Sequence, residues 1–168
     1  MKKNLILLEL NEINFDVVNF YIENGEILPG FKKLIDQGII QTESESEYKN
    51  LEPWIQWPSV HTGKAFTDHK IFRLGDVVNS DNRQFFEQVE EAGLSVGAIS
   101  PMNASNKLKN PVYFIPDPWT QTPSDKSYFS KNIAEAISQA VNDNSKSKLT
   151  FKTICNLGIS FIAIVHPS

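Results

Sequence analysis

The sequence predicts an α/β fold in which a mostly parallel sheet lies between helices, as in an incomplete α/β sandwich. Apolar runs at residues 5–8, 94–99 and 112–115 have the length of buried strands, and the first shows no polar alternation. Between and after these runs, apolar residues recur at helical spacing. Helices that alternate with buried strands are typical of a parallel sheet that is covered on both faces.

The first strand is expected at residues 5–8, Leu-Ile-Leu-Leu, and it ends in a cluster of acidic and amide side chains at residues 9–12. In open α/β sheets, ligands bind at the carboxyl ends of the strands. Asn14 follows and can cap a helix, which the next glycine, Gly25, would end. The apolar face of this helix would hold Phe15, Val18 and Ile22.

A second helix is expected over residues 28–38, because Pro29 suits the first turn and Gly38 suits the end. Residues 39–40 would then begin another strand. Later in the chain, the same patterns predict further elements: a helix over 85–92 closed by Gly93, strands over 94–99 and 112–115, a helix over 130–141, and a core helix or strand over 154–165.

The stretch at residues 50–63 contains two tryptophans, two prolines, hydroxyls and an imidazole. Proline removes a backbone donor, so this composition predicts a shaped loop that leads into a short helix. Ser59 would then lie at the helix N-terminus, where unpaired N–H groups favour both a hydroxyl nucleophile and an anionic substrate group. The alternative is a buried aromatic corner in which Ser59 is an ordinary N-cap.

Composition limits the classes of function. The 168 residues suffice for one domain with a core, and the net charge of −4 without a basic stripe argues against nucleic acid as a partner. Cys155 is the single cysteine, which excludes an internal disulfide. No apolar run reaches the roughly 20 residues of a membrane span, and residues 4–9 are too short for a signal peptide, so a cytoplasmic location is expected.

The order of these features resembles the amino-terminal half of the alkaline phosphatase superfamily, which includes type I phosphodiesterases, nucleotide pyrophosphatases and sulfatases. The resemblance covers roughly residues 4–120. It rests on a strand with an acidic turn, the run Leu-Pro-Gly-Phe-Lys-Lys-Leu-Ile-Asp-Gln-Gly at 28–38, and a loop with Pro-Ser, Thr62-Gly63 and His69. No single motif is specific, and the order and spacing carry the inference.

The resemblance implies a pair of divalent metals, usually Zn²⁺, and a Ser or Thr that attacks a small anionic phosphoester or sulfoester. It places metal ligands at Glu9 or Asn11, with His61 as a further candidate. The family's nucleophile position, two residues before the motif proline, is Gln56, which cannot attack. The catalytic candidates are therefore Ser59 and, behind it, Thr62. The alternative is that the polar groups solvate a strand end and that His61 bonds to backbone.

Family members supply most metal ligands from later parts of a longer domain, whereas here only His166 follows His69 among the histidines. Residues 1–168 are therefore expected to form one α/β domain that is the amino-terminal part of a larger metallohydrolase domain. Two interpretations remain open: a metal-dependent phosphoester or sulfoester hydrolase that is expected to be inactive as this short chain, or a non-catalytic or vestigial α/β binding domain. Self-association or a completing chain is expected.

Overall fold

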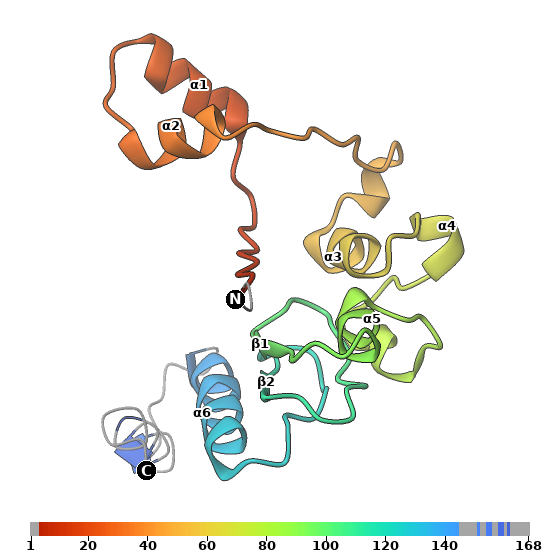
Figure 1. Ribbon diagram of the computed structural model, residues 1–168. Helices are drawn as coiled ribbons and strands as arrows, with labels where there is room; N and C mark the ends of the chain where they lie inside the picture. The colour runs from red at the N-terminus through yellow and green to blue at the C-terminus, as the bar shows by residue number, and fades with distance from the viewer. Residues whose placement is uncertain (1–3, 145–150, 152–153, 156–157, 160, 162–168) are drawn as a thin grey trace. The chain divides into compact units, whose positions relative to one another are not determined.

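A computed structural model describes residues 4–144, 151, 154–155, 158–159 and 161 of this chain (Figure 1). Among them are six α-helices and one two-stranded parallel sheet, so the predicted α/β class is confirmed. The chain divides into two compact units, Met1–Ser44 and Glu45–Ser168. A single domain over 1–168 and a larger sandwich stay predictions. The expected element at 154–165 lies largely outside the described residues.

The first unit contains two helices, both near their predicted places. Helix α1 (Phe15–Glu23) begins after Asn14, whose side-chain oxygen accepts the backbone N–H groups of Asp16 and Val17 at 2.8 and 3.2 Å. Helix α2 (Pro29–Asp36) has proline in its first turn, where a missing N–H costs nothing. The Phe15 ring meets the Phe31 ring edge-on at 6.4 Å, which joins the two helices.

The strands expected at residues 5–8 and 39–40 do not form in the described part of the first unit. The four apolar side chains at 5–8 are between 60 and 91% exposed. A strand needs a neighbouring strand for its hydrogen bonds, and the regular elements of this unit are two helices. The prediction of a central strand at residues 5–8 is therefore wrong.

The second unit carries the remaining elements, and each described helix or strand after residue 84 matches a predicted one. Helix α5 starts with reciprocal capping between Gln84 and Glu87, as expected for a helix ended by Gly93. In chain order the elements are η1 (Tyr48–Asn50), α3 (Pro53–Thr62), α4 (Phe66–His69), η2 (Asp76–Asn79), α5 (Phe85–Glu91), β1 (Gly97–Ile99), β2 (Tyr113–Ile115) and α6 (Tyr128–Asn144).

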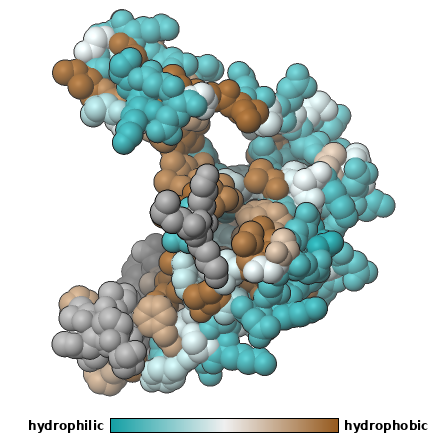
Figure 2. All heavy atoms as spheres, in the orientation of Figure 1, coloured by the Kyte–Doolittle hydropathy of each residue, from teal (hydrophilic) through white to brown (hydrophobic). Residues whose placement is uncertain are grey.

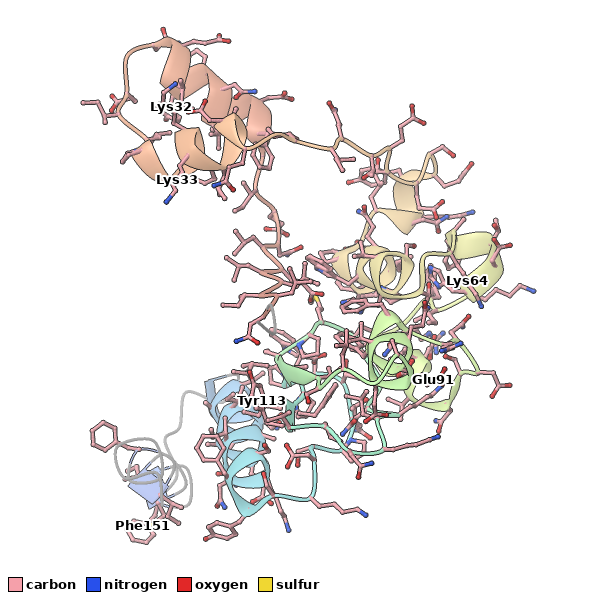
Figure 3. All side chains as sticks on the ribbon, in the orientation of Figure 1. Lys32, Lys33, Lys64, Glu91, Tyr113 and Phe151 are labelled. Atoms are coloured by element: carbon pink, nitrogen blue, oxygen red, sulfur yellow. The ribbon has the colours of Figure 1, made fainter. Side chains whose placement is uncertain are left out.

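Strands β1 and β2 pair in parallel, with Gly97 opposite Tyr113 and Ile99 opposite Ile115. The predicted strands at 94–99 and 112–115 are thus confirmed, each shortened to three residues. Gly97 is needed for this register, because a Cβ there would lie 2.5 Å from Cζ of Tyr113. Tyr113 is labelled in Figure 3, beside the sheet.

Asp125 closes the outer edge of β2. Its backbone N–H donates to the Phe114 carbonyl at 3.0 Å, and its side chain accepts the Phe114 N–H at 2.6 Å. Burial opposes ionisation of this carboxyl, but hydrogen bonds from Ser127 and Phe114 help to outweigh burial, and the pKa of Asp125 is lowered. Helix α6 begins directly after this tie.

The core of the second unit lies where α5 packs on the sheet. It consists of Phe86, Val96, Ala98, Ala104 and Phe114, and the last of these is fully buried. Helix α5 and the sheet therefore share one packed core. In the part of the chain that the structure describes, no helix is both long and apolar enough to cross a membrane.

Candidate functional site

Ser59 is the seventh residue of the ten-residue helix α3, which begins at Pro53 after the N-cap Glu52. The expectation that Ser59 stands at a helix N-terminus is therefore wrong. The prolines do not prevent the helix, since Pro53 occupies its first turn and Pro58 is accepted in its interior. Ser59 is half-buried and has no unpaired helix N–H groups beside it to bind an anion.

Pro58 lacks the N–H that would bond to the Trp54 carbonyl one turn earlier. Asn103 replaces that donor: its Nδ2 donates to the Trp54 carbonyl at 2.6 Å. The same amide nitrogen lies 3.3 Å from the Arg73 carbonyl, and Oδ1 accepts the Gly75 N–H at 2.9 Å. Asn103 is fully buried and has φ 48°, a left-handed conformation that asparagine tolerates better than most residues.

The Ser59 hydroxyl lies 2.9 Å from Nε2 of His69, at the end of α4. The other ring nitrogen, Nδ1, accepts the backbone N–H of Ile71 at 3.0 Å. A backbone N–H can only donate, so Nδ1 must be unprotonated, and the neutral ring carries its proton on Nε2. His69 therefore donates to the Ser59 oxygen.

The surroundings of His69 keep the ring neutral. Its side chain is only 3% exposed, and this burial is the main cause of its lowered pKa. The charge of Glu45 acts in the opposite direction, whereas Lys64 lowers the pKa further. Glu45 itself is positioned by the Phe66 N–H, which donates to it at 2.7 Å. At neutral pH, then, His69 is a hydrogen-bond donor to Ser59 and carries no charge.

The direction of the Ser59–His69 hydrogen bond decides what the two residues can do chemically. A histidine that acts as general base for serine must accept the hydroxyl proton at the nitrogen nearest to it. Here that nitrogen already carries a proton, so His69 cannot activate Ser59 in this arrangement. The Nε2–H group can instead stabilise negative charge on the Ser59 oxygen. Sequence reasoning used His69 only as a marker of the motif, and its contact with Ser59 was missed.

Thr62, the second catalytic candidate, is occupied at the end of α3. Its hydroxyl donates to the Pro58 carbonyl at 2.7 Å and accepts the Lys64 N–H at 3.3 Å. Gly63 then ends the helix in a left-handed conformation, with φ 67°. Both contacts of the Thr62 hydroxyl serve this helix end, which leaves Ser59 as the better candidate for chemistry.

His61, the third metal-ligand candidate, lies in an aromatic corner. It is 1% exposed, stacks on Trp57 at 5.9 Å between ring centroids, and contacts Phe85 and Phe86 at 5.9 and 5.3 Å. Residues two apart on a helix do not face each other, so His61 and Ser59 point in different directions. The buried aromatic corner of the alternative interpretation is present, but its other half, Ser59 as an N-cap, is wrong because Glu52 is the N-cap of α3. The aromatic neighbours of His61 supply no further metal ligand.

Glu9 and Asn11 belong to the first unit, so their convergence with Ser59 stays a prediction. Neither lies on a strand, and Asn11 is exposed. Within the described residues there is no group of three or more His, Cys, Asp or Glu side chains that could hold a metal ion. The donor set that the resemblance implies is thus not assembled from the residues that the structure describes.

Comparisons of this chain with protein-family models, with curated proteins and with solved structures find no match. The candidate site therefore rests on its own geometry. It consists of the Ser59 hydroxyl on α3 and the neutral His69 imidazole at the end of α4, and the Asn103 amide donates to the Trp54 carbonyl of α3.

Proposed function

We propose that this chain carries part of a metal-dependent phosphoester or sulfoester hydrolase, with Ser59 as the attacking oxygen. The observation that supports this is the direction of the Ser59–His69 hydrogen bond. A hydrolase that relied on a Ser–His pair would need the opposite direction. Activation that does not depend on a histidine base is what the alkaline phosphatase resemblance implies, and a donated N–H would favour the ionised Ser59 oxygen.

The substrate class follows from the same resemblance: a small anionic phosphoester or sulfoester. The proposal includes a larger parallel sheet and metal ligands from Glu9 or Asn11. A catalytic zinc takes about three protein ligands, so two metals need about six. The sequence offers few candidates, so the 168-residue chain is expected to bind Zn²⁺ or Mn²⁺ weakly and to show little or no turnover.

A second candidate is a non-catalytic α/β binding module. Ser59 lies within a helix instead of at its start, and both ring nitrogens of His69 have partners inside the protein. A hydroxyl–imidazole pair of this kind can simply tie α4 to α3. In this interpretation Ser59 contributes to stability and takes no part in chemistry.

The experiment that separates these candidates combines metal analysis with an activity assay on the purified 168-residue chain. Bound metal is measured by elemental analysis, and hydrolysis of bis(p-nitrophenyl) phosphate is followed with Zn²⁺ and with Mn²⁺, beside Ser59→Ala. Ser80→Ala is the matched control, because Ser80 is also half-buried and bonds within its own turn, to the Val77 carbonyl.

Weak metal-dependent turnover that Ser59→Ala abolishes and Ser80→Ala leaves intact would support the hydrolase. The module is supported if neither Zn²⁺ nor Mn²⁺ binds at any concentration tested and Ser59→Ala lowers only the melting temperature. Stoichiometric, tightly held metal would contradict the expected weakness of the site in these 168 residues.

A further inference from the structure

A shallow groove lies on the second unit, apart from Ser59, between η2 and the loop that follows β2. Its volume is about 360 Å³, in the range of small-ligand sites. Leu74 and Trp119 give it apolar surface, and Asn79 and Gln121 give it two carboxamides. The six lining residues are Leu74, Gly75, Val78, Asn79, Trp119 and Gln121.

Both walls of the groove are held by buried or partly buried hydrogen bonds. On one wall, the Gly75 N–H donates to the Asn103 side chain at 2.9 Å. On the other, the backbone N–H groups of Trp119 and Thr120 donate to the Asp117 carboxylate at 2.8 and 2.7 Å. Asp117 also accepts the Asn103 N–H at 2.8 Å, so one buried asparagine joins the two walls. A groove of this rigidity loses little entropy when a ligand binds.

The Trp119 side chain is 52% exposed although its backbone is fixed. An exposed indole offers a flat apolar face to a ligand. Asn and Gln side chains each provide both donors and acceptors, which suits a neutral ligand that has both at its edge. None of the six lining residues is charged, so a nucleotide or another anion would find no counter-charge among them.

We propose that this groove binds a neutral pyranose sugar. One face of a pyranose ring presents C–H groups that can pack on the Trp119 indole, and its hydroxyls can each donate to and accept from Asn79 and Gln121. The proposal is independent of the hydrolase proposal, because it uses none of the residues around Ser59. A single platform with two amides predicts weak binding, with a Kd on the order of millimolar.

The test is an NMR titration of the full chain that follows the indole N–H signals of its three tryptophans. The probes are the methyl glycosides of glucose, galactose and N-acetylglucosamine, each to about 100 mM, well above the expected Kd. Adenosine and AMP are titrated in parallel. We expect a saturable shift of one indole signal with at least one glycoside, and its assignment to Trp119 follows from its loss in Trp119→Phe.

Variants make the result specific to the groove. Because variants at Trp119 lack the indole signal, binding to each variant is measured by saturation-transfer difference NMR on the glycoside. Trp119→Ala and Gln121→Ala are expected to weaken glycoside binding at least tenfold, while Trp119→Phe keeps part of it. Tyr48→Ala is the matched control, since it removes an 89% exposed aromatic side chain elsewhere on the same unit. The proposal is overturned if none of the three glycosides gives a saturable shift, if glycoside binding is unweakened in Trp119→Ala, or if adenosine alone binds.

Discussion

His69 is held between the Ser59 hydroxyl and the Ile71 N–H, so its two ring nitrogens have fixed and different roles. A second proton on the ring would face the Ile71 N–H, donor against donor. Protonation therefore breaks a hydrogen bond between α4 and the following residues as well as placing a charge in a buried position. Both effects agree with the lowered pKa of His69, whose main cause is burial.

Because His69 binds a proton less readily in the folded chain than in the unfolded chain, stability is predicted to fall at acidic pH. Unfolded His69 has its ordinary pKa of 6.5, and the folded value is lower. As pH falls below 6.5, the unfolded chain binds the proton more readily, so the free energy of unfolding decreases until the folded pKa is reached. Above 6.5 this contribution is complete. We expect urea unfolding between about pH 7.5 and about pH 5.5 to show this loss.

His69→Gln is the test variant, because its amide can donate to Ser59 without titrating, and it should flatten the pH dependence. The pKa of Glu87 is raised, mainly by burial, so its contribution to the free energy of unfolding increases as the pH falls toward its ordinary pKa of 4.5. This effect is opposite to that of His69, and the unfolding measurements therefore stop above that range. An unchanged pH dependence in His69→Gln would show that another group is responsible.

At the scale of elements, helix α3 tolerates Pro58 because a residue from a distant loop repairs the hydrogen bond that proline removes. Asn103 lies 49 positions from Trp54 in the sequence, yet its amide occupies the Trp54 carbonyl. A buried carbonyl without a donor costs about 1–3 kcal/mol, so the helix and the loop stabilise each other.

A double-mutant cycle measures this repair. Asn103→Ala should lower the free energy of unfolding by about 2–4 kcal/mol, since it leaves the Trp54 carbonyl and the Gly75 N–H without their partner. With Pro58→Ala, a restored backbone N–H can bond to the Trp54 carbonyl. The cost of Asn103→Ala in that background should then be smaller by about 1 kcal/mol.

Asn132→Ala is the matched control for the cycle, because Asn132 is also a buried asparagine and bonds to the Tyr128 carbonyl within α6. Its effect should add to that of Pro58→Ala without coupling. Equal costs of Asn103→Ala in both backgrounds, measured by chemical denaturation, would mean that the amide does not replace the missing helix bond.

At the scale of the molecule, each of the two units leaves apolar side chains in contact with water (Figure 2). In the first unit these include the run at residues 5–8, and in the second they include Leu94 and Ile99, the last residue of the short strand β1. Exposed apolar runs of this kind are prone to pack against other copies of the chain. The sheet itself has two strands of three residues, which is small for independent stability.

We therefore predict that the purified chain self-associates, and that Ile6→Lys with Leu8→Lys reduces the association. The substitutions place two positive charges within the exposed apolar run. They also remove apolar surface, whose burial in an interface stabilises association by about 25 cal/mol per Å². Glu12→Lys controls for the change of charge alone. Sedimentation velocity at several protein concentrations measures the outcome. Equal association in the variant and the control would show that residues 5–8 are not the contact.

The sequence alone determined those features whose causes are local. Asn14 and Pro29 predicted the starts of α1 and α2, Gly93 marked the end of α5, and the apolar runs identified β1 and β2, because caps, turns and short-range periodicity act within a few residues. The α/β class followed from the order of these elements. The aromatic corner around His61 was also foreseen as an alternative.

Only the tertiary structure decided the rest, because the deciding contacts join residues that are far apart in the chain. Whether the run at 5–8 becomes a strand depends on a neighbouring strand, which its sequence does not contain. Ser59 lies inside a helix because Asn103 completes the bonding around Pro58. The direction of the Ser59–His69 bond depends on the Ile71 N–H, a backbone group that no side-chain motif could reveal.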